Sequence, residues 1–398
     1  MAATSPPTQR TSIPFYRDIR IIAVILQVVF AVLVLAGLWY LYTNMMAGLR
    51  RANLLPTFGF LSAPAGFPIA ESVIPYDPSM TYGRAFVVGV LNTLRVAITG
   101  IILATILGIF IGICRLSNNW LLRNTAVVYV EIVRNIPLLL QLIFWFLLTK
   151  AFPRVQESID VGGLLFLHNR GVTLAWPSAE AAFAAFTPWL WVALLAAAGY
   201  YAFRRYQFAR RDRPGVAMPY ALLIALGIVL LGFFATRLIA GQWPVTLEIP
   251  ELQRFNFVGG ITVTASFAAL LVGLVIYTAA FISEIVRSGI QAVSKGQREA
   301  ARALGLTNGQ TLRLVIFPQA LRIMIPPMTS QYLNLTKNSS LAIAIAYPDL
   351  FYVGNTINNQ TGQAVPVILM LMASYLSVSL LTSALMNWYN RSIQLVER

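Results

Sequence analysis

The chain has 398 residues, of which 58% are hydrophobic and only 11% charged, and its formal net charge is +15. Soluble domains carry about 25% charged residues, so this composition excludes an ordinary water-soluble protein and indicates a polytopic membrane protein. With one cysteine, Cys114, and one histidine, His168, the chain cannot form an internal disulfide or a Cys/His zinc site. His168 lies outside any apolar run, and we interpret it as an exposed loop residue without a catalytic or metal role.

Apolar runs in chain order predict an all-α fold with about eight transmembrane helices. The first run, 21–42, extends about 33 Å as a helix, which is enough to cross a hydrocarbon core of about 30 Å. Since it is longer than a signal-peptide core, we interpret it as a retained anchor. Prolines and glycines at 53–77 then predict an ordered external loop. The other seven runs are 86–113, 125–148, 189–203, 217–235, 261–285, 320–346 and 366–388.

The distribution of Lys and Arg predicts the orientation. If the N-terminus is inside, the inner segments hold roughly twice as many Lys and Arg residues as the outer segments, so we expect both termini to be cytoplasmic. The inner face is then strongly basic. The positive-inside bias and anionic lipids explain this charge, and we expect no nucleic-acid partner.

The segment 294–318, on the predicted inner side, contains the residues that typically begin and end two short helices. A capping-box spacing would begin each helix, a glycine would end the first, and a proline would end the second. The residues concerned are Ser294 with Gln297, Gly305, Thr307 with Gln310, and Pro318. Between the caps, alanines offer a small, flat surface that lets another backbone approach closely.

This segment resembles the EAA loop of bacterial ABC importer permeases. The matching positions are Glu299, Ala300, Ala301, Gly305, Val315, Phe317 and Pro318, where the family pattern ends in Ile-x-Leu-Pro. The resemblance implies that the loop docks on a separate ABC ATPase dimer, which binds ATP and Mg²⁺, while this chain holds no cofactor. That division agrees with the absence of a Gly-Lys pair, and hence of a Walker A loop, from the sequence. The alternative is an amphipathic hairpin that matches by chance.

Further motifs narrow the resemblance to the polar amino acid (histidine/glutamine-type) uptake permeases. They lie at 89–94, 115–117, 129–141, 283–291, 318–327 and 337–341. The leading anchor, the Pro-rich loop and the extra spans near 189–235 resemble the long permease subunit of general L-amino acid transport systems. The resemblance implies an ABC importer type I permease core in the bacterial inner membrane. It also implies a second homologous permease subunit in a heterodimer, a periplasmic amino-acid-binding protein and an L-amino acid substrate.

The resemblance also suggests a division of the chain. Residues 1–84 would be the anchor helix and a periplasmic Pro-rich loop, and 85–150 the first part of the permease core. Residues 151–259 would be periplasmic loops with an inserted helix pair. Residues 260–398 would be the second part of the core, with the cytoplasmic coupling loop at 294–318.

Charged side chains in the spans are expensive, at about 2.5 to 3.5 kcal/mol each near the bilayer centre, so we expect them to face protein or water. Glu131 with Arg134, and Glu284 with Arg287, are each three residues apart, so each pair can partly neutralise itself. Structural pairing, gating between states and substrate contact are all open roles for them.

A polar cluster follows Pro326-Pro327, where we expect the helix to be interrupted. It consists of Lys337, Asn334, Asn338 and Ser339. Freed backbone groups and a cation at membrane depth suit the carboxylate of an amino acid, so these residues are candidates for the substrate path. The alternative is a helix cap near the outer surface. Arg95 and Gln141 are further candidates for the same cavity.

Two other classes of protein are less compatible with the sequence. An ion-coupled secondary amino acid transporter needs carboxylates in its spans, and both that are available, Glu131 and Glu284, have an arginine neighbour. A membrane-embedded enzyme needs a cluster of catalytic residues that we do not find. We therefore expect neither catalytic residues nor a metal site.

Overall fold

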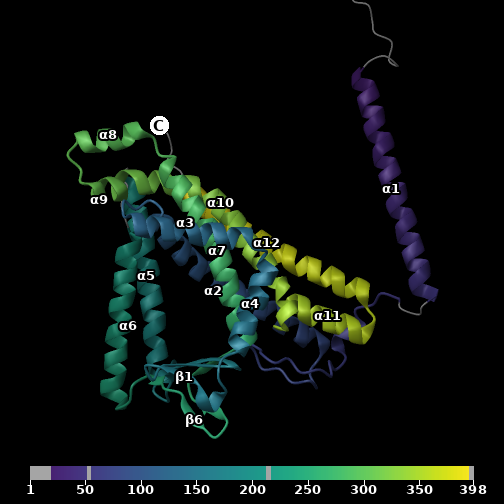
Figure 1. Ribbon diagram of the computed structural model, residues 1–398, viewed down its shortest axis with the longest axis horizontal. Helices are drawn as coiled ribbons and strands as arrows, with labels where there is room; N and C mark the ends of the chain where they lie inside the picture. Colours follow the sequence, from purple (N-terminus) through teal and green to yellow (C-terminus); the bar gives the residue numbers. More distant parts are fainter. Residues whose placement is uncertain (1–18, 52–54, 212–216, 394–398) are drawn as a thin grey trace, which may run out of the picture.

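The computed structural model describes residues 19–51, 55–211 and 217–393, and it is mostly helical. Figure 1 shows the arrangement of its elements. The long helices are α1 (Ile19–Arg51), α2 (Tyr82–Cys114), α3 (Trp120–Asn135), α4 (Leu138–Lys150), α5 (Phe183–Arg211), α6 (Met218–Ala240), α7 (Ala265–Gln291), α10 (Phe317–Asn338) and α12 (Ala364–Ile393). The shorter ones are α8 (Lys295–Ala303), α9 (Asn308–Thr311) and α11 (Leu350–Thr361).

Within the described residues, six helices are long and apolar enough to cross a membrane, namely α1, α2, α5, α6, α7 and α12. Helices α3 and α4 would supply a seventh crossing if they act together as one span, and they are bent by 106° where they meet. The predicted single helix over 125–148 is therefore wrong. Pro137 explains the break, because a residue before proline is driven out of the α-region, and Ile136 is extended (φ −99°, ψ 130°). The predicted span over 320–346 corresponds to α10, which is not among these candidates.

Helix α10 also corrects the expected interruption at Pro326 and Pro327, since both prolines lie inside a continuous helix. Each proline removes one backbone N–H from the helical ladder. The carbonyls that lose this partner are those of Arg322 and Ile323, four residues before each proline. The hydroxyl of Thr329 donates to the carbonyl of a third residue, Ile325 (3.0 Å).

The centre of the bundle is the close packing of α2 against α7. A Cβ on Gly108 would lie 2.6 Å from the Cβ of Ile282, and one on Gly112 would lie 2.8 Å from the Cβ of Val286. Only glycine permits this approach of the two helices. Helix α10 packs against the same pair, so the buried core of the bundle is formed by α2, α7 and α10.

Short antiparallel strands occupy the connections that we expected to be loops. One sheet has the order β1-β2-β3-β8, and two hairpins pair β4 with β5 and β6 with β7. The strands are β1 (Ile159–Val161), β2 (Leu165–His168), β3 (Gly171–Leu174), β4 (Trp176–Ala179), β5 (Val245–Glu248), β6 (Glu251–Gln253), β7 (Asn256–Val258) and β8 (Ile261–Thr264). The predicted start of a span at 261 is thus wrong, because 261–264 pairs with β3 and Thr264 caps α7 through its hydroxyl.

The expectation for His168 is wrong as well. It ends β2 with only 2% of its surface exposed. Its Nε2 lies 2.9 Å from the hydroxyl of Thr173, and its ring stacks on Phe257. Burial, followed by the charge of Arg170, lowers the pKa of His168 from its usual 6.5. The histidine is a structural residue of the sheet.

The Pro-rich segment before α2 is ordered, as predicted. Ala65 and Phe67 are buried in a cluster with the first turns of α2 and with α11 and α12. An isolated bridge between Pro64 and Thr81 closes the segment, and Thr81 then caps α2. The loop is therefore a packed part of the fold.

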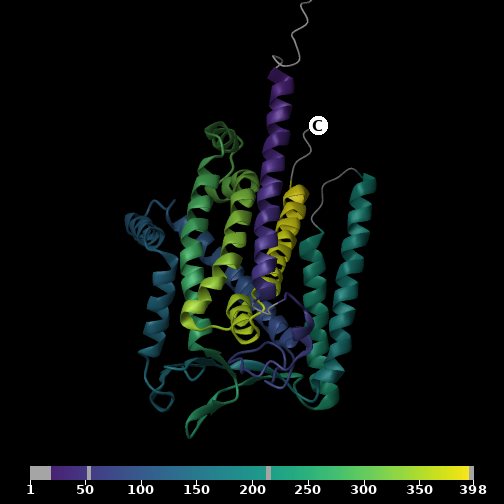
Figure 2. The same cartoon turned by 90° about the vertical axis from the view of Figure 1, so that its right-hand side faces the viewer.

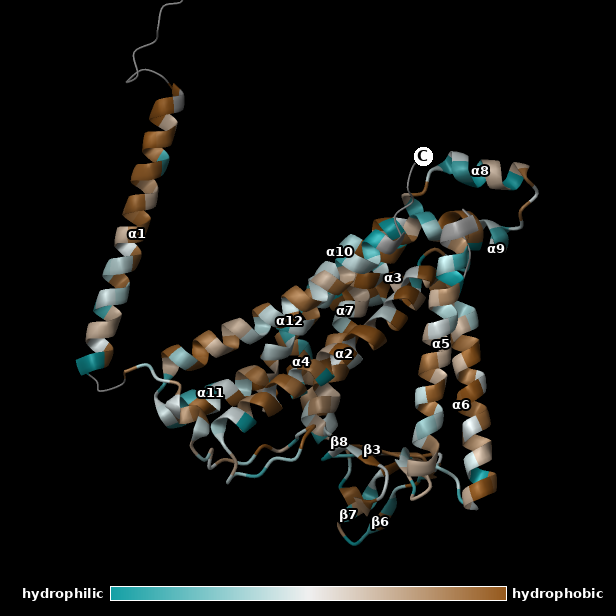
Figure 3. Ribbon diagram, turned by 180° about the vertical axis from the view of Figure 1, so that it is seen from behind, coloured by the Kyte–Doolittle hydropathy of each residue, from teal (hydrophilic) through white to brown (hydrophobic). Residues whose placement is uncertain are grey.

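Two views place the functional regions at opposite ends. Hairpin α8–α9 lies at one end of the bundle and the small sheets at the other (Figures 1 and 2). Helix α1 stands apart from the bundle, and α5 and α6 form an antiparallel pair at its side. Polar residues dominate α8, whereas α1 and the helices of the bundle are mainly apolar (Figure 3).

Candidate coupling hairpin and transport pathway

In the hairpin from 294 to 318, most of the predicted helix starts and ends are present. Gly305 has φ 76°, its N–H donates to Arg302 (2.9 Å), and the N–H of Leu306 donates to Ala301 (3.1 Å). These two bonds form a Schellman motif, which requires the left-handed conformation at Gly305. Thr307 and Gln310 form the second capping box.

Two details of the hairpin differ from the prediction. Ser294 caps α8 without a side-chain hydrogen bond, so the first capping box is not formed. Pro318 does not close the second element, because α9 continues through a π-helical turn, Leu312–Ile316, into α10. Pro318 lies in the first turn of α10, where its missing N–H is tolerated.

The alanines of α8 do not all lie on one exposed surface. Ala301 is buried against the body of the protein, while Ala300 and Glu299 are exposed. Leu304 at the tip is 81% exposed, and Leu314 on the second arm is 61% exposed. The hairpin therefore presents an acidic residue, a small residue and exposed apolar side chains at the end of the bundle.

Two side-chain contacts tie α8 to the bundle. Arg298 Nη2 donates to the carbonyl of Ile290 near the end of α7 (2.7 Å). Gln319 of α10 donates to Gln297 of α8 (3.4 Å). Helix α8 is thus joined by hydrogen bonds to both α7 and α10.

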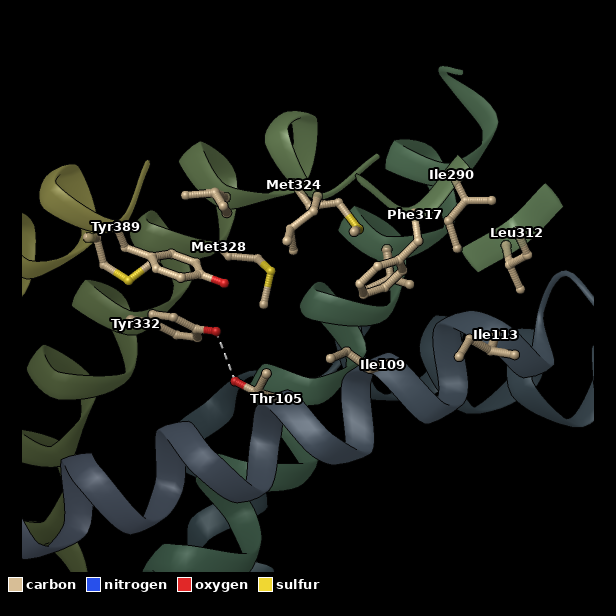
Figure 4. Close-up of a pocket in the computed structure, with 14 residues that line it drawn as sticks. Thr105, Ile109, Ile113, Ile290, Leu312, Phe317, Met324, Met328, Tyr332 and Tyr389 are labelled. Carbon is tan, nitrogen blue, oxygen red and sulfur yellow. Dashed lines mark hydrogen bonds between the residues drawn. The ribbon is translucent and has the colours of Figure 1, made fainter. Parts of the chain in front are cut away.

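An apolar cavity of about 250 Å³ lies behind the hairpin, between α2, α7, α10 and α12. Leu312 and Phe317, at the two ends of the π-helical turn, reach it from the hairpin side, and Met324 and Met328 reach it from α10 (Figure 4). In its wall the hydroxyl of Thr105 donates to the hydroxyl of Tyr332 (3.0 Å). Empty apolar space beside the root of the hairpin leaves room for its side chains to repack.

The two predicted ion pairs behave differently. Glu284 does bind Arg287, and it also binds Arg115 at the end of α2. Among the described residues no ion pair joins Glu131 to Arg134, since Glu131 is exposed and the guanidinium of Arg134 lies 5.1 Å from the ring of Phe281. Sequence reasoning missed Arg115, although the Arg115-Leu-Ser motif on the same predicted side as Glu284 was a usable signal.

The candidate path residues separate into three places. Asn334 and Asn338, on one face of α10, line a polar cavity of about 270 Å³ with Gln331 and with Tyr277, Thr278 and Phe281 of α7. Lys337 is exposed in the last turn of α10, and the hydroxyl of Ser339 donates to the carbonyl of Thr336 (2.8 Å). Thus only the two asparagines of the cluster share a cavity.

Gln141 and Arg95 lie elsewhere. The amide of Gln141 donates to the carbonyls of Val133 and Ile136, both at 2.9 Å, so it satisfies backbone groups that the bend between α3 and α4 leaves free. Arg95 pairs with Glu71 of the Pro-rich segment (2.6 Å). Neither residue lines the cavity formed by the asparagines.

Comparison with known proteins decides the family. Over 97% of its length the chain is 44% identical to the general L-amino acid transport system permease protein AapQ of Rhizobium johnstonii, and the match covers 94% of that protein. The chain belongs to the amino acid ABC transporter permeases. Residues 215–395 match the family described as the binding-protein-dependent transport system inner membrane component.

Two other permeases of the family are similar over nearly their whole length. The putative amino-acid ABC transporter permease protein YhdX of Escherichia coli is 44% identical over 94% of each chain. The glutamate/glutamine/aspartate/asparagine transport system permease protein BztB of Rhodobacter capsulatus is 40% identical over 100% of this chain and 99% of its own. The protein is therefore a membrane-spanning transport subunit and not an enzyme, and permeases of this class work with ATPase and binding-protein partners.

Proposed function

We propose that this permease forms the membrane path of an ATP-driven importer of L-amino acids in the bacterial inner membrane, and that hairpin α8–α9 docks on its ATPase dimer. The observation that carries the docking role is the rigid, exposed hairpin itself. Gly305 fixes its tip, and Glu299, Ala300 and Leu304 are exposed on it. ATP and Mg²⁺ belong to the partner ATPase.

The proposed orientation follows from the same hairpin. If it faces the cytoplasm, the sheets at the opposite end face the periplasm. The start of α1 and the end of α12 then lie on the cytoplasmic side, in agreement with the bias of Lys and Arg toward the inner segments. The sheets and the Pro-rich segment would receive the periplasmic amino-acid-binding protein.

The polar cavity between α7 and α10 is the best-supported part of the proposed path. Amide groups of Gln331, Asn334 and Asn338 offer donors and acceptors there without a fixed charge. Such a lining suits a polar solute that must leave again. Lys337, exposed at the end of the same helix, would bring a cation to the entrance of this path.

A second permease subunit completes the proposal. Exposed apolar side chains on α3 and α4, among them Leu140 and Phe144, offer surface for lipid or for another subunit. The names of the relatives place them in multi-subunit systems, and we expect a homologous chain in a heterodimer. Glu284 with its two arginines would then act as a latch that changes between states, and Arg134 and Glu131 would lie near the same path.

The test is transport in proteoliposomes that contain both permeases, the ATPase and the binding protein. We expect uptake of L-amino acids that requires ATP and stops with vanadate. Glu299→Lys should abolish uptake while membrane insertion stays normal, and Glu157→Lys, at a carboxylate near the sheets, is the matched control. Uptake driven by an ion gradient without ATP, or normal transport by Glu299→Lys, would contradict the proposal.

A further inference from the structure

Glu71 of the Pro-rich segment holds α2 and α7 together at the sheet end of the bundle. Its Oε1 accepts from Arg95 Nη1 and its Oε2 accepts from the hydroxyl of Thr264, both at 2.6 Å. The side-chain amide of Asn92 donates to its backbone carbonyl (2.8 Å). With three anchors and only 10% of its side chain exposed, Glu71 fixes the position of the arginine.

Arg95 forms part of the wall of a cavity of about 440 Å³. The Pro-rich segment, α2, the strands β3, β4 and β8, and the first turn of α7 surround this space. Its guanidinium carbon lies 4.3 Å from the centre of the Phe267 ring, which supports the plane of the guanidinium through a cation–π contact. Thr99 adds a hydroxyl to the wall, and Trp176 adds an aromatic side chain.

The surrounding residues do not use all the hydrogen-bond donors of the Arg95 guanidinium. It carries five N–H donors, and in the part of the chain that the structure describes its one hydrogen-bond partner is Glu71. With 26% of its side chain exposed, Arg95 keeps donors available to a ligand. A planar guanidinium held by a carboxylate on one side and by a ring on its face is organised to bind a second carboxylate in two-point fashion.

The rest of the wall suits a varied side chain. Leu174, Ile261 and Val263 of the sheet give the cavity an apolar surface. The cavity is larger than one amino acid requires, so the apolar side does not select one shape. The guanidinium of Arg95 would recognise the α-carboxylate, which all L-amino acids share.

We propose that this cavity is an outer subsite for L-amino acids, in which Arg95 binds the α-carboxylate and Glu71 is its positioning residue. The inference rests on the proposed import function, because it takes the sheet end as the side from which substrate arrives. The subsite is distinct from the asparagine cavity between α7 and α10.

A purely structural ion pair is the competing explanation, and the chain offers a matched control for it. Arg84 also ties the Pro-rich segment to α2, with Nε and Nη2 donating to the carbonyl of Pro75 at 3.3 and 3.0 Å. Arg84 does not line the cavity. Arg84→Met therefore removes an equivalent tie between loop and helix without touching the subsite.

The first experiment compares uptake by the complete transporter. Removing a charge-assisted bond to the carboxylate should slow uptake by about tenfold or more in Arg95→Met combined with Glu71→Gln. The swapped pair, Arg95→Glu with Glu71→Arg, should recover thermal stability but not uptake. Arg84→Met should transport within about twofold of the wild type. Full recovery of uptake by the swapped pair would establish a structural role and overturn the subsite.

The second experiment measures occupancy without transport. Thr99→Cys in a Cys114→Ser background places a single thiol on the cavity wall. L-leucine and L-histidine should slow its reaction with an anionic methanethiosulfonate, whereas isoamylamine and histamine, which lack the carboxylate, should not. Equal protection by the amines, or protection that persists in Arg95→Met, would overturn the inference. Loss of ATP-dependent uptake in the wild type would instead reject the proposed function.

Discussion

Arg115 and Glu284 form an ion pair that joins the end of α2 to α7 across 169 positions of sequence. Arg287 binds the other oxygen of the same carboxylate, so two arginines share one acidic group, which balances only one of their two charges. The cluster lies on the segment of α7 that leads into hairpin α8–α9. It therefore joins the two central helices next to the root of the hairpin.

Arg115→Met should destabilise the permease by about 1 to 3 kcal/mol, because it leaves Glu284 with one partner and only 29% of its side chain exposed. Thermal unfolding in detergent measures this change. Arg123→Met, at an exposed arginine of α3, is the control and should leave the midpoint unchanged. Equal midpoints for the two variants would show that the ion pair contributes nothing to stability.

Gly305→Val should uncouple transport through backbone strain alone. A Cβ at this position meets nothing within 4 Å, but φ is +76°, a conformation that costs an ordinary residue about 1 to 2 kcal/mol. Gly305→Asn is the control, since asparagine tolerates the left-handed region. We expect ATP-dependent uptake to be lost in the valine variant and largely kept in the asparagine variant. If both variants transport normally, the conformation of the hairpin tip is not needed.

Ile109→Phe should fill part of the apolar cavity of about 250 Å³ behind the hairpin. Cavity filling commonly stabilises a protein by about 0.5 to 2 kcal/mol, so thermal stability should rise. If the hairpin needs this space to move, uptake should fall at the same time. Ile98→Phe, at an exposed position of α2, should change neither quantity. A stabilised variant with undiminished uptake would exclude a role for the cavity in movement.

His168 should make the small sheet sensitive to acid. Its pKa is lowered from 6.5 in the folded protein, so protons bind the unfolded state more tightly. The neutral ring contributes its full stability above pH 6.5, and that stability is lost as the pH falls through 6.5 toward the lower folded value. The difference in midpoint between wild type and His168→Gln should shrink from pH 7.5 to 5.5. A constant difference would contradict this linkage.

The hairpin could be predicted in detail because its conformation is local. Gly305, Thr307 and Gln310 act within one turn of the chain, so spacing alone identifies their roles. The same holds for the long apolar helices, whose length and composition are sufficient. The family resemblance read from these motifs is confirmed by the relatives.

Features that depend on contacts between residues far apart in the sequence could not be predicted in this way. The pairing of β3 with β8 joins residues about ninety positions apart, and nothing in 261–264 distinguishes a strand from the start of an apolar helix. Nothing in the sequence around Glu71 indicates its partner Arg95, because the arginine lies in another element. Likewise, the burial of His168 depends on Phe257, which no local pattern indicates.

The unbroken course from α9 through the π-helical turn into α10 has a mechanical consequence. A rotation applied at Thr307 would reach Asn334, about 40 Å along the helix axis, through the π-helical turn and past Pro326 and Pro327. A twist of the root would swing the amide-bearing face of α10 relative to α7, which opens or closes the polar cavity from a distance. Movement of a partner ATPase bound at the tip of the hairpin would then rotate the residues that line the polar cavity.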